Sequence, residues 1–281
     1  MTVAVCVKVH DGLVLAADSA STIVDAQGNV VNVYNNANKI FELCKGLPIG
    51  GMTWGAGSLG QSSITTLAKD LRRRFSGSDA AHQDWAVDSA SYTLEAVAAA
   101  TRRFLFEEVY VPTYGSAPAK PSLGFTIAGY SAGATSPEEW RVTIDSGVSR
   151  PPELVQPGEQ AGITWSGQPE AISRLVLGHS PQLRSVLADL GAPADQLDTV
   201  MGVVAQRLQT FLWTPPMPIQ DAIDLAEFLV HCTVMYSRFG AGPQSVGGPI
   251  EVSAITKHEG FKWVRRKHYY EPSLNRSEES S

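Results

Sequence analysis

Cysteine is scarce in this chain, which has only three in 281 residues. Cys6, Cys44 and Cys232 are odd in number and far apart, so they do not match the paired framework of a small secreted domain. This usage fits buried thiols in a reducing cytosol, and we expect a cytoplasmic protein. The six histidines are equally dispersed, and we find no spacing typical of metal ligands. The sequence therefore predicts no metal site and no cofactor.

Long apolar stretches and an excess of positive charge are also missing. The longest uncharged apolar runs fall well short of the ~20 residues that span a bilayer. Near the start, Lys8, His10 and Asp11 interrupt what would be the apolar core of a signal peptide. The net charge of −6 argues against a nucleic-acid surface. We therefore expect neither a membrane nor a nucleic acid as partner.

The chain is long enough for a large core, with 43% hydrophobic and 18% charged residues. A β-hairpin and further strands are followed by two predicted helices, 59–75 and 85–109, and then by more strands. Ser58 and Gln61 form a capping-box pattern at the start of the first helix. Runs of strands and helices in this order favour an α+β fold. We expect one domain over 1–270, with extra helical material at 181–213, and a polar mobile tail over 271–281.

The first eighteen residues carry the clearest pattern. Valine alternates with other residues from Val3 to Val9, which predicts a strand on a half-buried surface. Asp11-Gly12 is a strong hairpin turn signal, and the chain then returns through an apolar run that ends at Asp18. The hairpin would bring the Asp18 carboxylate back towards Thr2.

Thr2 is a candidate nucleophile. Methionine is usually removed when the next residue is small, which would leave Thr2 with a free α-amine. Such an amine titrates near pH ~8 and can accept the proton of the threonine hydroxyl. The alternative is a plain N-terminal hairpin with an accidental threonine, and on Thr2 alone that alternative is favoured.

Three later segments favour a catalytic Thr2 over the plain hairpin. Asn38-Lys39-Ile40-Phe41 places a lysine at the head of an apolar strand, and the turn 53–57 ends in Gly55-Ala56-Gly57. A third segment carries Ser166 at the end of a strand. Taken singly, Lys39 suits a solvated strand end, and Ser166 suits the cap of the helix that begins at Pro169.

Together with residues 1–2 and 12–19, these motifs resemble the β-subunits of the proteasome, which are N-terminal-nucleophile hydrolases. The likeness covers residues 2–76 and recurs more weakly at 121–131, 163–177 and 247–256. The spacing of sixteen residues between Thr2 and Asp18 equals the family's. The resemblance implies a four-layer αββα sandwich, with two antiparallel sheets between two helix layers. The family also has bacterial relatives, the ancestral β-subunit among them. The alternative is that this longer chain is more similar to those relatives than to the proteasome β-subunits.

The resemblance also implies roles for single residues. Thr2 would attack, Asp18 would orient Lys39, and the Lys39 ammonium would lower the pKa of the Thr2 hydroxyl. The N–H of Gly55 would stabilise the oxyanion of the tetrahedral intermediate. Ser166 would form a hydrogen bond with the α-amine of Thr2. The residues that would line the substrate pocket are small and polar: Ala20, Ser21 and Thr53.

The chain departs from the family in two places. Trp165 replaces a glycine that precedes the family's serine. Before Gly247, the family carries an aspartate and a serine that support the amine, and here Pro243 and Val246 take their positions. Ser245 or Gln244 could substitute only if the loop shifts.

The expected function is that of a threonine-type endopeptidase in a homo-oligomeric ring. Its substrate would be a polypeptide, and an unfolding ATPase would be a partner. One alternative is a non-catalytic ring or scaffold subunit, which the missing aspartate and serine favour. Another is an amidase of the same nucleophile class that acts on small amides.

Overall fold

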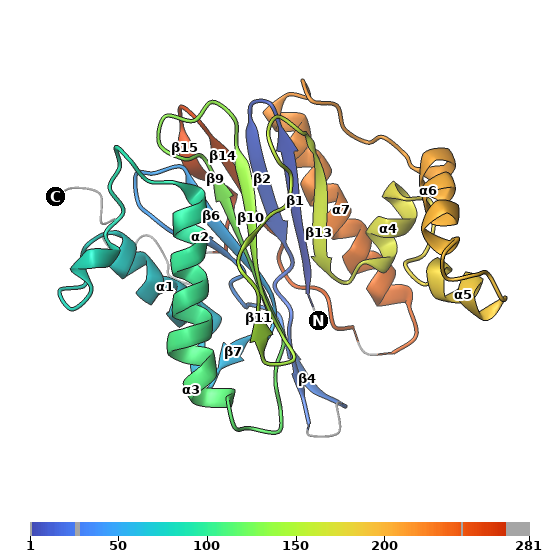
Figure 1. Ribbon diagram of the computed structural model, residues 1–281, viewed down its shortest axis with the longest axis horizontal. Helices are drawn as coiled ribbons and strands as arrows, with labels where there is room; N and C mark the ends of the chain where they lie inside the picture. Colours follow the sequence, from blue (N-terminus) through green and yellow to red (C-terminus); the bar gives the residue numbers. More distant parts are fainter. Residues whose placement is uncertain (1, 26–28, 243, 268–281) are drawn as a thin grey trace.

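A computed structural model describes residues 2–25, 29–242 and 244–267. Two antiparallel sheets form its centre (Figure 1). The first has the strand order β13, β1, β2, β14, β15, which span Gly162–Gly167, Val3–Val9, Gly12–Ala17, Glu251–Thr256 and Gly260–Arg265. The second has the order β11, β10, β9, β6, β5, which span Val148–Ser149, Glu138–Asp145, Leu123–Gly129, Ile49–Gly55 and Ile40–Glu42, and β12 (Glu153–Leu154) also pairs with β10.

Helices cover the outer face of each sheet (Figure 1). On the β9–β10 side lie α1 (Ile64–Phe75) and α2 (Leu94–Arg102), and α2 continues through a π-helical segment, η2 (Arg103–Tyr110), into α3 (Val111–Tyr114). On the β1–β2 side lie α4 (Glu170–Val176) and α7 (Ile219–Phe239). The remaining elements are η1 (Gln83–Trp85), α5 (Leu183–Asp189), α6 (Leu197–Leu208), the hairpin β3–β4 (Ser21–Val24, Val30–Tyr34) and the hairpin β7–β8 (Ser58–Leu59, Ser62–Ser63).

Apolar side chains pack in three clusters. One lies between the second sheet and helices α1 and α2, another between the first sheet and α7, and a third between the two sheets. This arrangement is mixed α and β. Its assignment to the four-layer αββα sandwich of the N-terminal-nucleophile hydrolases stays a prediction.

Strand β1 is buried on both faces, whereas the alternating valines predicted a half-buried strand. The valines face α7, and Ala4 and Cys6 face the second sheet, so neither face reaches water. Lys8 is accommodated because its ammonium donates to the carbonyls of Gln156 and Gly158 at 2.9 and 2.8 Å. The hairpin itself forms as expected, with Ala4 opposite Ala17.

Both predicted helix starts are wrong. Residues 58–63 form the β7–β8 hairpin, and α1 begins at Ile64, where the Ser63 hydroxyl accepts the N–H of Thr66 at 3.1 Å. The second helix begins at Leu94, with Thr93 as its cap, instead of at residue 85. The last strand ends at Arg265, and the tail expected over 271–281 lies outside the described residues.

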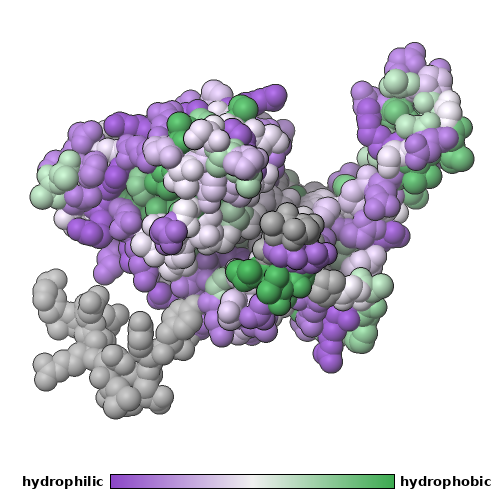
Figure 2. Space-filling model, turned by 90° about the horizontal axis from the view of Figure 1, so that it is seen from below, coloured by the Kyte–Doolittle hydropathy of each residue, from purple (hydrophilic) through white to green (hydrophobic). Residues whose placement is uncertain are grey.

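The expected extra helical segment, 181–213, contains α5 and α6. These helices project from the body, and Figure 2 shows hydrophobic side chains on their surface. Val186, Leu190 and Val203 are exposed there. Among the described residues, no helix combines the length and apolar character needed to cross a membrane.

Candidate active site

The β1–β2 hairpin places Thr2 beside Asp18. Thr2 directly precedes β1 and Asp18 directly follows β2, and both are buried. The N–H of Asp18 donates to the carbonyl of Val3 at 3.3 Å, and the N–H of Val3 donates to Asp18 Oδ1 at 3.0 Å. The carboxylate is therefore fixed one residue from the candidate nucleophile.

Asp18 and Lys39 form a buried ion pair. Lys39 Nζ lies 2.5 Å from Asp18 Oδ1, and the Asp18 side chain is fully buried. The other carboxylate oxygen accepts the N–H groups of Ala20 and Gly247 at 3.1 and 3.0 Å. Asp18 thus accepts hydrogen bonds from Val3, Lys39, Ala20 and Gly247, which give both oxygens of the buried carboxylate partners.

Lys39 lies just before β5, and its carbonyl accepts the N–H of Thr53 in β6. Burial lowers the pKa of the Lys39 ammonium from its usual value, and the Asp18 carboxylate opposes that shift. A buried ammonium of lowered pKa is typical of catalytic lysines, and structural ion pairs show it too.

Thr2, Lys39 and Gly55 line one cavity of about 220 Å³. The three residues predicted to form the substrate pocket, Ala20, Ser21 and Thr53, line the same cavity. Gly55 ends β6 with φ +88°, and a Cβ there would lie 2.5 Å from the carbonyl oxygen of Ser122. Only glycine fits this position, because a side chain would meet both an unfavourable φ and the backbone of Ser122.

Ser166 lies on β13, opposite Ala4 of β1. Opposite residues of an antiparallel pair share a face, and so do residues two apart along a strand, so Ser166 is on the face that Thr2 continues. Ser166 does not line the cavity, and it does not cap a helix, because α4 begins at Glu170 with no side-chain cap. Its proposed bond to the Thr2 amine stays a prediction.

The loop before Gly247 lacks the aspartate and the serine of the proteasome family, as the sequence already indicated. Val246 is fully buried in the cluster that packs against α7, Ser245 is buried, and Pro243 lies outside the described residues. The loop instead supplies the Gly247 N–H that Asp18 accepts. Sequence reasoning missed this contact, because a backbone donor leaves no trace in residue type.

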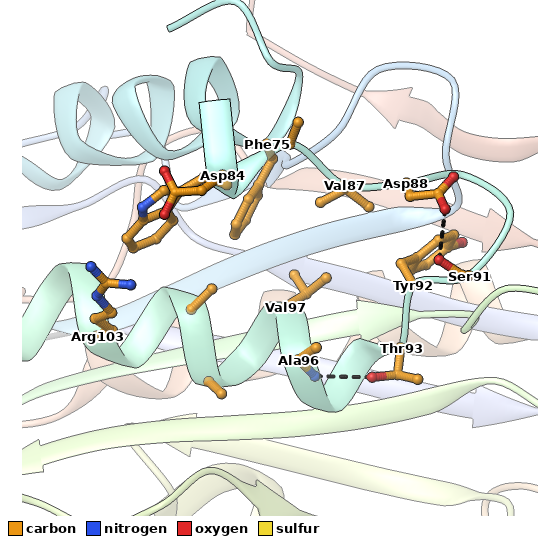
Figure 3. A pocket seen from close by; sticks show the side chains of 14 residues that line it. Phe75, Asp84, Val87, Asp88, Ser91, Tyr92, Thr93, Ala96, Val97 and Arg103 are labelled. Atoms are coloured by element: carbon orange, nitrogen blue, oxygen red, sulfur yellow. Dashed lines mark hydrogen bonds between the residues drawn. The ribbon is translucent and has the colours of Figure 1, made fainter. Parts of the chain in front are cut away.

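A larger cavity, about 510 Å³, lies between η1 and α2 and contains none of the predicted site residues (Figure 3). Three of its polar residues are engaged locally: Ser91 Oγ donates to Asp88 at 2.7 Å, and Thr93 caps α2. Across the described parts of the chain, no three His, Cys, Asp or Glu side chains gather as a metal site requires.

Neither protein-family models nor curated proteins give a match to this chain. Among solved structures, it is similar to the Anbu complex of Pseudomonas aeruginosa, described as a helical assembly, with TM-score 0.53 and 15% identity over 97% of this chain and 90% of that one. It is also similar to Anbu (ancestral beta-subunit) from Yersinia bercovieri, with TM-score 0.54 and 13% identity over 95% and 89% of the two chains.

This finding corrects the resemblance to proteasome β-subunits. Anbu proteins are proteasome-like but form a distinct family, and the motifs at 2–19, 38–41 and 55–57 did not distinguish the two. At 13–15% identity the likeness shows the fold alone.

Proposed function

We propose that this chain is a threonine-type peptidase that works through Thr2 after the removal of Met1. The observation that supports this most is the meeting of Thr2, Lys39 and Gly55 at one cavity, with Asp18 paired to Lys39. The fold would then be the αββα sandwich of the N-terminal-nucleophile hydrolases.

In the proposed reaction, Thr2 Oγ attacks the peptide carbonyl carbon, and the hydroxyl proton passes to the α-amine of Thr2. The N–H of Gly55 stabilises the oxyanion, a contact worth roughly 3–4 kcal/mol in the transition state. The C–N bond then breaks, and the leaving amine takes the proton from the Thr2 amine. Water hydrolyses the resulting ester with the same amine as base. Lys39 stays an ammonium throughout and favours the ionised hydroxyl.

We further propose that the active form is a homo-oligomer. The Pseudomonas protein with a similar fold forms a helical assembly, and the exposed apolar residues of α5 and α6 suit contacts with other copies. An unfolding ATPase and an enclosed ring stay predictions.

A non-catalytic assembly subunit is the second candidate. Val246, fully buried where the proteasome family has a serine, favours it, because one support of the amine is then missing. The buried ion pair of Asp18 and Lys39 opposes it, since an ion pair costs desolvation and gives a scaffold no evident gain.

The test is the intact mass of the purified protein after treatment with a threonine-directed peptide epoxyketone. We expect loss of Met1 and one adduct in the wild type, and no adduct in Thr2→Ala. The mass of the particle by light scattering reports the assembly separately. Retained Met1 with no adduct would refute the peptidase and favour the assembly subunit.

A further inference from the structure

A second buried ion pair lies next to the first. Glu251 starts β14 and Lys267 follows β15, and their side chains are only 2% and 6% exposed. Lys267 Nζ lies 3.2 Å from Glu251 Oε2. The reaction proposed above uses neither residue. Burying two charges is costly, so such a pair is better explained by a positional or electrostatic role than by stability.

The Lys267 ammonium joins the two segments that carry Asp18 and Lys39. It donates to Ser19 Oγ and to the carbonyl of Ala37, both at 2.6 Å. Ser19 follows Asp18 directly, and Ala37 precedes Lys39 by two residues.

Backbone bonds close the same connection. The N–H of Ala37 donates to the carbonyl of Ser19 at 2.9 Å, and the N–H of Ser19 donates to the carbonyl of Gly247 at 2.9 Å. Ser19 Oγ in turn donates to the carbonyl of Pro249 at 2.5 Å. Lys267 is thus bonded to the framework that sets the distance between Asp18 and Lys39.

The four side chains form two ion pairs, Lys39 with Asp18 and Lys267 with Glu251. Glu251 and Lys267 also act electrostatically on Lys39. The carboxylates of Asp18 and Glu251 raise the pKa of Lys39, whereas burial and the Lys267 ammonium lower it. Glu251 and Lys267 therefore shift the pKa of Lys39 in opposite directions.

We propose that Lys267, neutralised by Glu251, is a positioning residue that holds the Lys39 ammonium in place beside Thr2. This inference rests on the proposed function, in which Lys39 acts in its charged form. It adds a residue from the far end of the described chain to the machinery of Thr2.

The experiment compares Lys267→Met, Glu251→Gln and the exposed-site control Lys262→Met with the wild type. The rate of epoxyketone labelling at Thr2 is measured across pH, with circular dichroism as the folding check. We expect the rate of Thr2 labelling in the Lys267→Met variant to fall roughly tenfold to a hundredfold, because a small misplacement of reacting groups has an effect of that size. Lys262→Met should label as the wild type does.

The pH profile separates positioning from a merely structural role. Loss of the Lys267 charge raises the pKa of Lys39, so the alkaline limb of the profile moves to higher pH. Loss of the Glu251 charge moves that limb to lower pH. If Lys267→Met does not fold, Lys267→Gln replaces it, because its amide still donates to Ser19 and Ala37 without the charge. Wild-type rates with an unshifted limb in both variants would overturn the proposal.

Titration of Lys39 by NMR of ¹³C-labelled lysine, assigned with Lys39→Arg, gives a readout that needs no activity. Absence of a Thr2 adduct in the wild type would refute the proposed function. The positioning role fails separately if the Lys39 titration is the same in the wild type, Lys267→Met and Glu251→Gln. A Lys39 titration that moves to higher pH in Lys267→Met and to lower pH in Glu251→Gln would support the positioning role.

Discussion

At the scale of single residues, Gly167 determines where Thr2 lies. Gly167 has φ +91°, and a Cβ there would lie 1.8 Å from the carbonyl oxygen of Thr2. The next residue, Gln168, donates its N–H to the same oxygen at 2.7 Å. The backbone of Thr2 is therefore held by a contact that only glycine permits.

Gly167→Ala should displace Thr2 and lower the rate of epoxyketone labelling at least tenfold, with a fall in thermal stability. The added methyl meets the backbone of Thr2, which cannot yield as a flexible side chain does. Gly133→Ala is the matched control, because Gly133 has φ +71° and open space around it. That control should cost about 1–2 kcal/mol for the left-handed backbone and leave labelling unchanged. Equal labelling by both variants would contradict the assigned role.

Sequence reasoning identified the site residues from one hairpin and from the order of motifs along the chain. Thr2 and Asp18 are joined by one tight hairpin, so their meeting follows from the valine alternation and the Asp11-Gly12 turn. Lys39 and Gly55 came from the order of motifs, and both line the cavity with Thr2. Glu251 and Lys267 were missed, because the pairing of β14 with β2 and with β15 brings them to the segments of Asp18 and Lys39, and no local pattern specifies that pairing.

At the scale of elements, the start of α1 shows how two capping signals compete. Ser58 with Gln61 matches the capping box, but Gly60 takes φ +58° and turns the chain into the β7–β8 hairpin. The helix then starts after Ser63 instead. The β1–β2 hairpin was predicted correctly because the alternation of β1 extends over many residues, whereas a cap depends on one or two.

Ser63→Ala should lower the free energy of unfolding by about 1 kcal/mol, since the Thr66 N–H loses its acceptor. Ser58→Ala is the control and should change it by less than about 0.5 kcal/mol, because Ser58 is exposed and caps no helix. Urea unfolding at equilibrium measures both. Ser63 also lines the cavity, so labelling of Thr2 in Ser63→Ala would show whether a frayed α1 disturbs the site. A larger loss from Ser58→Ala would refute this assignment of the cap.

At the scale of the whole molecule, a buried carboxyl group lies beside Cys6, a member of the cluster between the two sheets. Glu139 of β10 is 1% exposed and accepts two contacts from Thr164 Oγ1, at 2.8 and 2.9 Å. Arg141 Nη2 lies 3.6 Å from Glu139 Oε1. Burial raises the pKa of Glu139, and the Thr164 hydroxyl and Arg141 only partly oppose that shift. Burial and Glu139 also raise the pKa of Cys6, which keeps this thiol protonated.

Glu139 should therefore make the whole fold less stable as pH rises. The folded state keeps the Glu139 proton to higher pH than the unfolded chain, whose glutamate titrates near ~4.3. Between the unfolded and folded pKa values, the folded state binds more protons, so the free energy of unfolding falls by about 1.4 kcal/mol for each rise of one in pH. Below that window the contribution of Glu139 is fully present, and above it the loss is complete.

Glu139→Gln removes this titration and keeps an oxygen that can accept the Thr164 hydroxyl. We expect the wild type to lose more stability than the variant as pH rises above the titration of an unfolded glutamate, near ~4.3. Urea unfolding at several pH values measures the difference, and Glu259→Gln, in the exposed β14–β15 turn, is the control that should follow the wild type. Parallel curves for Glu139→Gln and the wild type would mean that Glu139 stays charged in the folded protein. The contacts with Thr164 and Arg141 would then outweigh burial, and the region between the sheets would be a more polar environment than its apolar neighbours indicate.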